Sequence, residues 1–170
     1  MQTRPWWVAC VIALAILAAS AWWGSAAADD RETCKTATGD AAIEACTRAI
    51  ESKKYNNKKF KRTLSLLYTN RGVEYEIKKD YAHAVADHDQ AIKIDPKNWV
   101  PYNNRGNVYA AKQDYSHAIA DYDEAIKLNP KYADAFFNRG MAKRNIGDLA
   151  GSETDIAQAR ELKPGIGQQQ

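Results

Sequence analysis

Few of the residues and motifs that support catalysis, metal binding or nucleic-acid binding occur in this chain of 170 residues. Its three cysteines and three histidines have no zinc-ligand spacing, which argues against a structural metal. Neither a glycine-rich phosphate loop nor a Ser–His–Asp or Cys–His arrangement stands out, which argues against the common nucleotide-binding and hydrolytic sites. The formal net charge of +3 is too small to indicate a nucleic-acid partner. The sequence therefore predicts no catalytic residue, no cofactor and no metal ion.

Long apolar runs are absent beyond residue 23, so a membrane or export signal is confined to the N-terminus. There Arg4 precedes an uncharged run from Trp6 to Trp23, and three alanines follow at residues 26–28. This order predicts a signal peptide over residues 1–28, whose removal leaves a periplasmic or secreted protein. The alternative is an uncleaved inner-membrane anchor with the rest of the chain on the periplasmic side, since the 18-residue run is about enough to span a bilayer. A membrane partner is expected only if this segment remains as an anchor. A nucleic-acid partner is not expected, because the protein would be exported.

Glycine and proline are scarce, at nine and five residues, but their positions are periodic. Three glycines stand 34 residues apart, and a proline follows each of them after 24 residues: Gly72, Gly106, Gly140, Pro96, Pro130 and Pro164. A fixed period of this length is typical of stacked helical repeats. Such repeats bury one unit against the next and leave a long exposed surface for partners.

Each block contains the residues that a pair of antiparallel helices needs. The second helix has a good N-cap, and the proline ends it; the caps are Asp80, Asp114 and Asp148. A helical glycine costs about 1 kcal/mol relative to alanine, so its recurrence predicts a close approach of the two helices. We expect that approach at the small residues Ala84, Ala118 or Ser152 of the second helices.

The three blocks resemble the tetratricopeptide repeat, a helix–turn–helix unit of 34 residues. The resemblance implies an all-α solenoid with three full units, residues 65–98, 99–132 and 133–164, before a disordered tail, residues 165–170. The third unit has Lys143 in place of a tyrosine and Ser152 in place of an alanine, as suits a more polar end unit. Residues 29–64 contain a degenerate repeat hairpin and a basic linker.

Two cysteines, Cys34 and Cys46, lie six residues on either side of Asp40, which marks the turn of this degenerate hairpin. Both therefore stand at a similar height, about 9 Å from the turn. In an oxidising compartment such a pair favours a disulfide that closes the hairpin. Two buried free thiols and a thiol-active redox pair are the alternatives.

The resemblance also implies that the first helix of each unit lines a concave groove for a protein or peptide partner. The groove residues that it assigns are Asn70, Val73, Val100, Asn103, Asn104, Asn107, Phe137, Asn138, Met141 and Arg144. Asn70, Asn104 and Asn138 share one repeat position, and such a ladder can hydrogen-bond an extended peptide backbone. Some family members hold acidic chaperone tails in a basic clamp, but Asp134 stands here where that clamp needs a lysine.

One basic segment and two acidic pairs have competing interpretations. The segment is an anion-binding patch or, as we favour, a solvated linker, and it consists of Lys53, Lys54, Lys58, Lys59, Lys61 and Arg62.

Asp87 and Asp121 each precede another aspartate by two residues, and such neighbours do not share a helix face. We therefore expect solvated charges there rather than a metal site. His88 takes the packing position of Tyr122, which predicts a histidine in the core.

Together these features favour a non-catalytic protein-interaction scaffold in the bacterial envelope. A membrane-tethered assembly factor and a thiol-active protein are the alternatives. Self-association through the C-terminal end stays open, because no clear additional helix follows the third unit.

Overall fold

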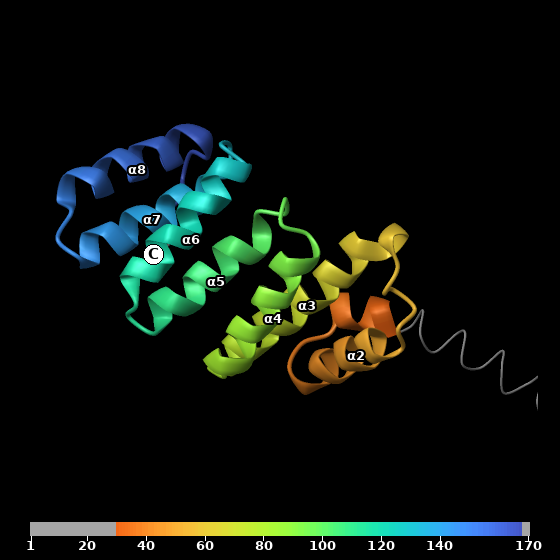
Figure 1. Ribbon diagram of the computed structural model, residues 1–170. Helices are drawn as coiled ribbons and strands as arrows, with labels where there is room; N and C mark the ends of the chain where they lie inside the picture. Colours follow the sequence, from red (N-terminus) through yellow and green to blue (C-terminus); the bar gives the residue numbers. More distant parts are fainter. Residues whose placement is uncertain (1–29, 168–170) are drawn as a thin grey trace, which may run out of the picture.

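The computed structural model describes residues 30–167, whose regular elements are helices (Figure 1). Residues 30–36 are helical, and the elements that follow are α2 (Asp40–Glu51), the 3₁₀ helix η1 (Lys58–Phe60), α3 (Lys61–Ile77), α4 (Tyr81–Ile94), α5 (Val100–Ala111), α6 (Tyr115–Leu128), α7 (Ala133–Asn145) and α8 (Leu149–Leu162). No strand occurs in this range, and the predicted all-α fold class is confirmed. The predicted signal peptide lies outside the described residues. None of the helices within residues 30–167 is long and apolar enough to cross a membrane.

From α3 onward the helices form three antiparallel pairs that stack into a solenoid (Figure 1). α3 packs on α4, α5 on α6 and α7 on α8, while α4 contacts α5 and α6 contacts α7 between the pairs. In addition α3 contacts α5, and α5 contacts α7, whereas no contact joins α4 to α6 or α6 to α8 among these described helices. The first helices therefore form the inner layer of a curved stack, and the second helices form its outer layer.

The turn within each pair has the same construction. The predicted caps are confirmed, because each carboxylate accepts a hydrogen bond from the backbone N–H three residues later: Asp80, Asp114 and Asp148. The residue before each cap has a positive φ, which is 61° at Lys79, 63° at Gln113 and 86° at Gly147. Only the third unit has glycine at this position, so the other two hold a side chain in a conformation that costs about 1 kcal/mol.

The repeated glycine brings the two helices of a unit together, but one turn further along than predicted. A Cβ atom on Gly72 would lie 2.7 Å from the ring of His88, and one on Gly106 would lie 2.7 Å from the ring of Tyr122. The nearest atoms belong to these rings and not to the expected small residues, Ala84 and Ala118. In the third unit the backbone oxygen of Ser152, an expected partner, does line the approach. The glycine thus makes room for a larger side chain, which is a ring in the first two units and Ile156 in the third.

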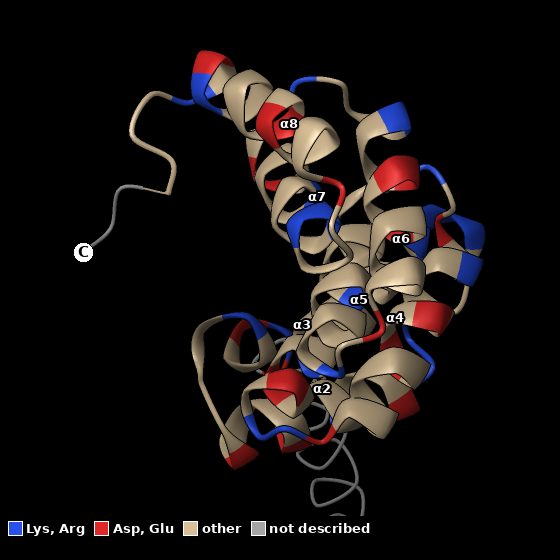
Figure 2. Cartoon of the chain, turned by 90° about the vertical axis from the view of Figure 1, so that its left-hand side faces the viewer, with Lys and Arg blue, Asp and Glu red and all other residues tan. Residues whose placement is uncertain are grey.

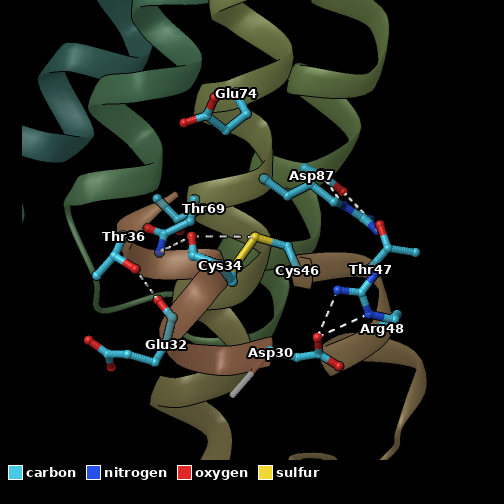
Figure 3. The surroundings of a disulfide bond; sticks show 12 residues. Asp30, Glu32, Cys34, Thr36, Cys46, Thr47, Arg48, Thr69, Glu74 and Asp87 are labelled. Carbon is cyan, nitrogen blue, oxygen red and sulfur yellow. Dashed lines mark hydrogen bonds and ion pairs between the residues drawn. A yellow bond between two sulfur atoms is a disulfide. The ribbon is translucent and has the colours of Figure 1, made fainter. Parts of the chain in front are cut away.

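A disulfide closes the N-terminal hairpin (Figure 3). It joins Cys34, in the helix of residues 30–36, to Cys46 of α2, and both residues are buried. The side chain of Glu74 accepts a hydrogen bond of 2.6 Å from the backbone N–H of Gly39, just before α2. This bond ties the hairpin to α3, on which α2 packs as a degenerate fourth unit.

The described structure extends slightly beyond the predicted repeat units at both ends. α3 begins at Lys61, directly after η1, and so extends one turn ahead of the predicted start of the first unit at residue 65. Residues 165–167, in the predicted tail, form turns that lie next to α7. A Cβ atom on Gly167 would lie 2.5 Å from the ring of Phe137. Residues 168–170 of that tail lie outside the described residues.

Candidate protein-binding groove

The residues that the sequence assigns to the groove lie on α3, α5 and α7, the inner layer of the stack, with unequal exposure. Met141 is 38% exposed and Arg144 is also exposed, whereas Asn103 is buried at 3% exposure. The others are half-buried: Asn70, Val73, Val100, Asn104, Asn107, Phe137 and Asn138. Half-buried side chains of this kind can contact a ligand while they also pack within the solenoid.

The three asparagines of the predicted ladder do not form an open row. Asn70 donates a hydrogen bond of 3.5 Å to the backbone oxygen of Cys34, so the N-terminal hairpin engages it. Asn104 accepts one of 3.4 Å from Asn103. Asn138 is held by the neighbouring unit. The ladder is therefore partly used inside the protein, and its members are not equivalent.

A polar cluster lies between α5, α6 and α7. Asn138 donates to Asn103 at 3.3 Å and to Asn107 at 3.1 Å, and the hydroxyl of Tyr122 donates to Asn107 at 2.9 Å. The amide nitrogen of Asn107 and the amide oxygen of Asn138 have no further partner among residues 30–167. A cavity of about 300 Å³ opens beside them, next to the side chain of Met141. One free donor and one free acceptor beside an apolar side chain suit a peptide group with an attached side chain.

The side chains of a basic clamp are missing from the described inner layer. Glu76 on α3 is half-buried without a hydrogen-bond or ion-pair partner among the described residues, and burial raises the pKa of its carboxyl group. Asp134 on α7 pairs with Lys163 at 3.1 Å. Thr69 is buried and donates its hydroxyl to the backbone of α3. Among the assigned groove residues Arg144 alone is positively charged, so the described groove lacks the set of cations that a basic clamp needs.

Each full unit contains a buried ion pair that the sequence interpretation missed. An arginine of the first helix reaches an aspartate of the second, 16 residues later, in the pairs Arg71–Asp87, Arg105–Asp121 and Arg139–Asp155. In the second unit Nε and Nη2 of Arg105 lie 2.9 and 2.6 Å from the two carboxylate oxygens of Asp121. This hydrogen bonding raises the pKa of the Arg105 guanidinium, against the opposing effect of burial.

The expectation that Asp87 and Asp121 are solvated charges was therefore wrong, since they are 5% and 6% exposed. The same arginines also bond to the preceding unit. Arg105 pairs with Asp89, and Nη1 of Arg139 lies 2.6 Å from Asp123. The two aspartates of each pair face different helices because each serves a different arginine. Each arginine thereby fixes the register both within its unit and against the unit before it.

His88 is a core residue, as predicted, but both of its ring nitrogens are buried without a hydrogen-bond partner in the described structure. Tyr122, at the same position of the next unit, bonds to Asn107. The first unit has Val73 in place of that asparagine, so the ring of His88 finds no acceptor or donor there. Burial first, and the positive charge of Arg105 second, lower the pKa of His88 to about 4.

The basic segment between α2 and α3 is exposed at all six of its lysine and arginine side chains. The intervening Tyr55 is buried at 4% exposure, and its ring packs edge-on against Phe60 with centroids 5.7 Å apart. The segment is therefore anchored to the core instead of being a freely solvated linker. Within residues 30–167, no three or more His, Cys, Asp or Glu side chains gather where they could hold a metal ion.

Comparison with known proteins agrees with this architecture. Residues 65–98 match the family model described as tetratricopeptide repeat, with the boundaries predicted for the first unit, and residues 106–147 match a model described as TPR repeat. No curated protein sequence matches the chain. Residues 65–98 and 106–147 therefore resemble tetratricopeptide repeats, and the described residues form a TPR-like α-solenoid.

Several solved structures share the fold. The first TPR domain of human RPAP3 is 27% identical with a TM-score of 0.58, over 59% of this chain and 79% of that one. The second TPR of Spaghetti (RPAP3), bound to HSP90 peptide SRMEEVD, is 25% identical with a TM-score of 0.58, over 68% of this chain and 99% of that one. The Arabidopsis OM64 TPR domain is 23% identical with a TM-score of 0.59, over 61% and 86% of the two chains, and shows the fold alone.

Proposed function

We propose that this protein is a non-catalytic scaffold of the bacterial cell envelope that binds a segment of another protein along the inner layer of its solenoid. Similar domains of RPAP3 are bound to an HSP90 peptide, which supports a role in protein interaction. The observation that carries the proposal is the cavity between α5, α6 and α7. There Asn107 and Asn138 keep one donor and one acceptor free beside Met141.

The partner segment that suits this groove is extended and carries no cluster of acidic residues. Its main chain bonds to Asn107 and Asn138, and an apolar side chain packs on Met141. The unpaired carboxylate of Glu76 disfavours an acidic segment such as the peptide SRMEEVD that RPAP3 binds. The partner class therefore differs from that of these structural relatives.

An envelope location is supported by the sequence of residues 1–28 and by the cysteine pair. We propose that the leader is removed on export and that the bond between Cys34 and Cys46 forms in an oxidising compartment. Both cysteines are buried, at 3% and 0% exposure, so thiol reagents have little access to the sulfur atoms. This burial favours a structural bond over a thiol-active function.

Site-specific photo-crosslinking in the producing cell tests the groove. A photoreactive residue at Met141 is expected to capture a discrete partner, because this side chain borders the cavity. The matched control is a photoreactive residue at Gln90, which is exposed on the outer helix α4. Equal capture from both positions, or none from Met141, would contradict the proposed groove.

A further inference from the structure

The connection between α2 and α3, together with the first two residues of α3, presents a dense set of positive charges, which we name the loop surface. It consists of Lys53, Lys54, Lys58, Lys59, Lys61 and Arg62. Two of them, Lys54 and Lys59, lie over the rings of Tyr55 and Phe60. All six side chains are exposed, and none pairs with a carboxylate of residues 30–167. Elsewhere both signs of charge are interspersed, as Figure 2 shows for the second helices, and lysines such as Lys127 and Lys163 have acidic partners.

The loop surface is held in place by its two aromatic residues. Tyr55 and Phe60 pack into the core cluster that contains Leu67 and the disulfide. Asn57 caps η1 by accepting a hydrogen bond of 3.0 Å from the backbone N–H of Lys59. The charged side chains therefore project from a fixed backbone. No acidic residue stands in the first turn of α3, so the positive end of its helix dipole adds to the positive potential.

Only residues 24–29 separate the apolar N-terminal run from Asp30 in the sequence. Asp30, the first described residue, pairs with Arg48 of α2 at 2.9 Å, and Figure 3 shows the two side chains together. Lys53 follows Arg48 by five residues, which is at most roughly 18 Å of chain. From Trp23 to Asp30 the chain can span at most roughly 25 Å. A bilayer that contains the apolar run thus lies within reach of the loop surface.

We propose that the loop surface binds the anionic headgroups of the bilayer into which the apolar N-terminal run inserts. The six positive side chains lie within residues 53–62, and each adds to the attraction of an anionic surface. A bilayer is favoured over nucleic acid or an acidic protein because the chain itself brings the loop surface to the bilayer. The contact orients the solenoid on the membrane before leader removal, and permanently if the leader stays. It is independent of the proposed groove.

Lysine acetylation of the full chain, measured residue by residue with mass spectrometry, tests this contact. The chain is mixed with vesicles of phosphatidylcholine alone or of phosphatidylcholine with phosphatidylglycerol. We expect acetylation of the loop lysines to be several-fold slower on the anionic vesicles at low salt, and high salt to abolish the difference. The comparison lysines should react equally on both vesicles: Lys93, Lys97, Lys127 and Lys131. Equal rates for the loop lysines, or equal protection of the comparison lysines, would overturn the proposal.

A pair of matched variants provides the second measurement. One carries K53Q, K54Q, K58Q and K59Q, and the other carries K93Q, K97Q, K127Q and K131Q, so both lose the same charge. The first is expected to bind anionic vesicles at least about tenfold more weakly than the second. Similar binding of the two variants refutes the assignment. Stronger protection of the loop lysines by duplex DNA or polyglutamate than by anionic vesicles also refutes it, in favour of those partners.

Discussion

Replacing His88 with phenylalanine should remove a loss of stability that the wild-type protein suffers in mild acid. The imidazole is fully buried against Gly72, and neither nitrogen has a partner in the described structure. Burial and the nearby charge of Arg105 lower its pKa from the ordinary 6.5 to about 4. The folded protein therefore keeps this side chain neutral at pH values where the unfolded chain protonates it.

The size of the effect follows from the two pKa values of His88. As pH falls from 6.5 to about 4, the unfolded state binds a proton that the folded state does not, so the free energy of unfolding decreases. The gap corresponds to roughly 3 kcal/mol. Above pH 6.5 this contribution is fully retained, and below about pH 4 it falls no further. The site accepts a six-membered ring in the second unit, where Tyr122 lies over Gly106, so His88→Phe should fold.

Urea unfolding, followed by circular dichroism from neutral pH to about pH 4, measures this contribution. The relevant quantity is the difference in unfolding free energy between wild type and His88→Phe, because the carboxylates common to both proteins largely cancel. This difference should move in favour of the variant by roughly 3 kcal/mol as the pH falls. The control His117→Gln alters a histidine whose side chain is 69% exposed and should leave most of the pH dependence intact. A His88→Phe profile parallel to wild type would refute the reasoning.

Three further changes test other parts of the fold by chemical denaturation. Arg105→Met leaves the buried carboxylate of Asp121 unpaired and should lower the free energy of unfolding by about 3 kcal/mol. A decrease below about 1 kcal/mol would mean that the pair is solvated. Gln113→Gly relieves a positive φ of 63° and should raise the free energy of unfolding by up to about 1 kcal/mol. A decrease would show that the glutamine side chain stabilises the fold by more than the backbone strain destabilises it. Replacing both Cys34 and Cys46 with alanine should lower the free energy of unfolding by about 2–3 kcal/mol. A reductant should lower the free energy of unfolding of the wild type by a similar amount and leave that of the variant unchanged. Insensitivity of wild type to complete reduction would contradict a stabilising bond.

The fold could be predicted because its main signals are local and repeated. The caps, the helix-ending prolines and the glycine period each depend on a few neighbouring residues. The Arg–Asp pairs were equally regular in sequence, since Arg105 and Asp121 recur with the same 16-residue spacing in all three units. They were missed because the aspartates were compared only with their acidic neighbours. A search for opposite charges at a fixed spacing across the turn would have found them.

The groove was harder to predict because the hydrogen bonds of its side chains depend on residues that are distant in the sequence. Asn70 and Asn138 share a repeat position, yet one turns to the carbonyl of Cys34 and the other to the adjacent unit. The difference arises because a degenerate hairpin, not a full unit, precedes α3. Likewise the unpaired ring of His88 depends on Val73, which has no partner for it where the next unit supplies an asparagine. Such pairings depend on tertiary packing that a single repeat position cannot specify.

The paired aspartates of the outer layer make the middle unit a self-sufficient building block. Asp121 serves the arginine of its own unit, and Asp123 serves the arginine of the next. Splicing in a second copy of residues 99–132 would reproduce both bonds at the new junction and lengthen the rod in register. The last unit cannot be multiplied in this way, since Ala157 occupies the position of the outgoing carboxylate. One side chain of the last unit, Ala157, thus leaves the array without a carboxylate to receive a further unit.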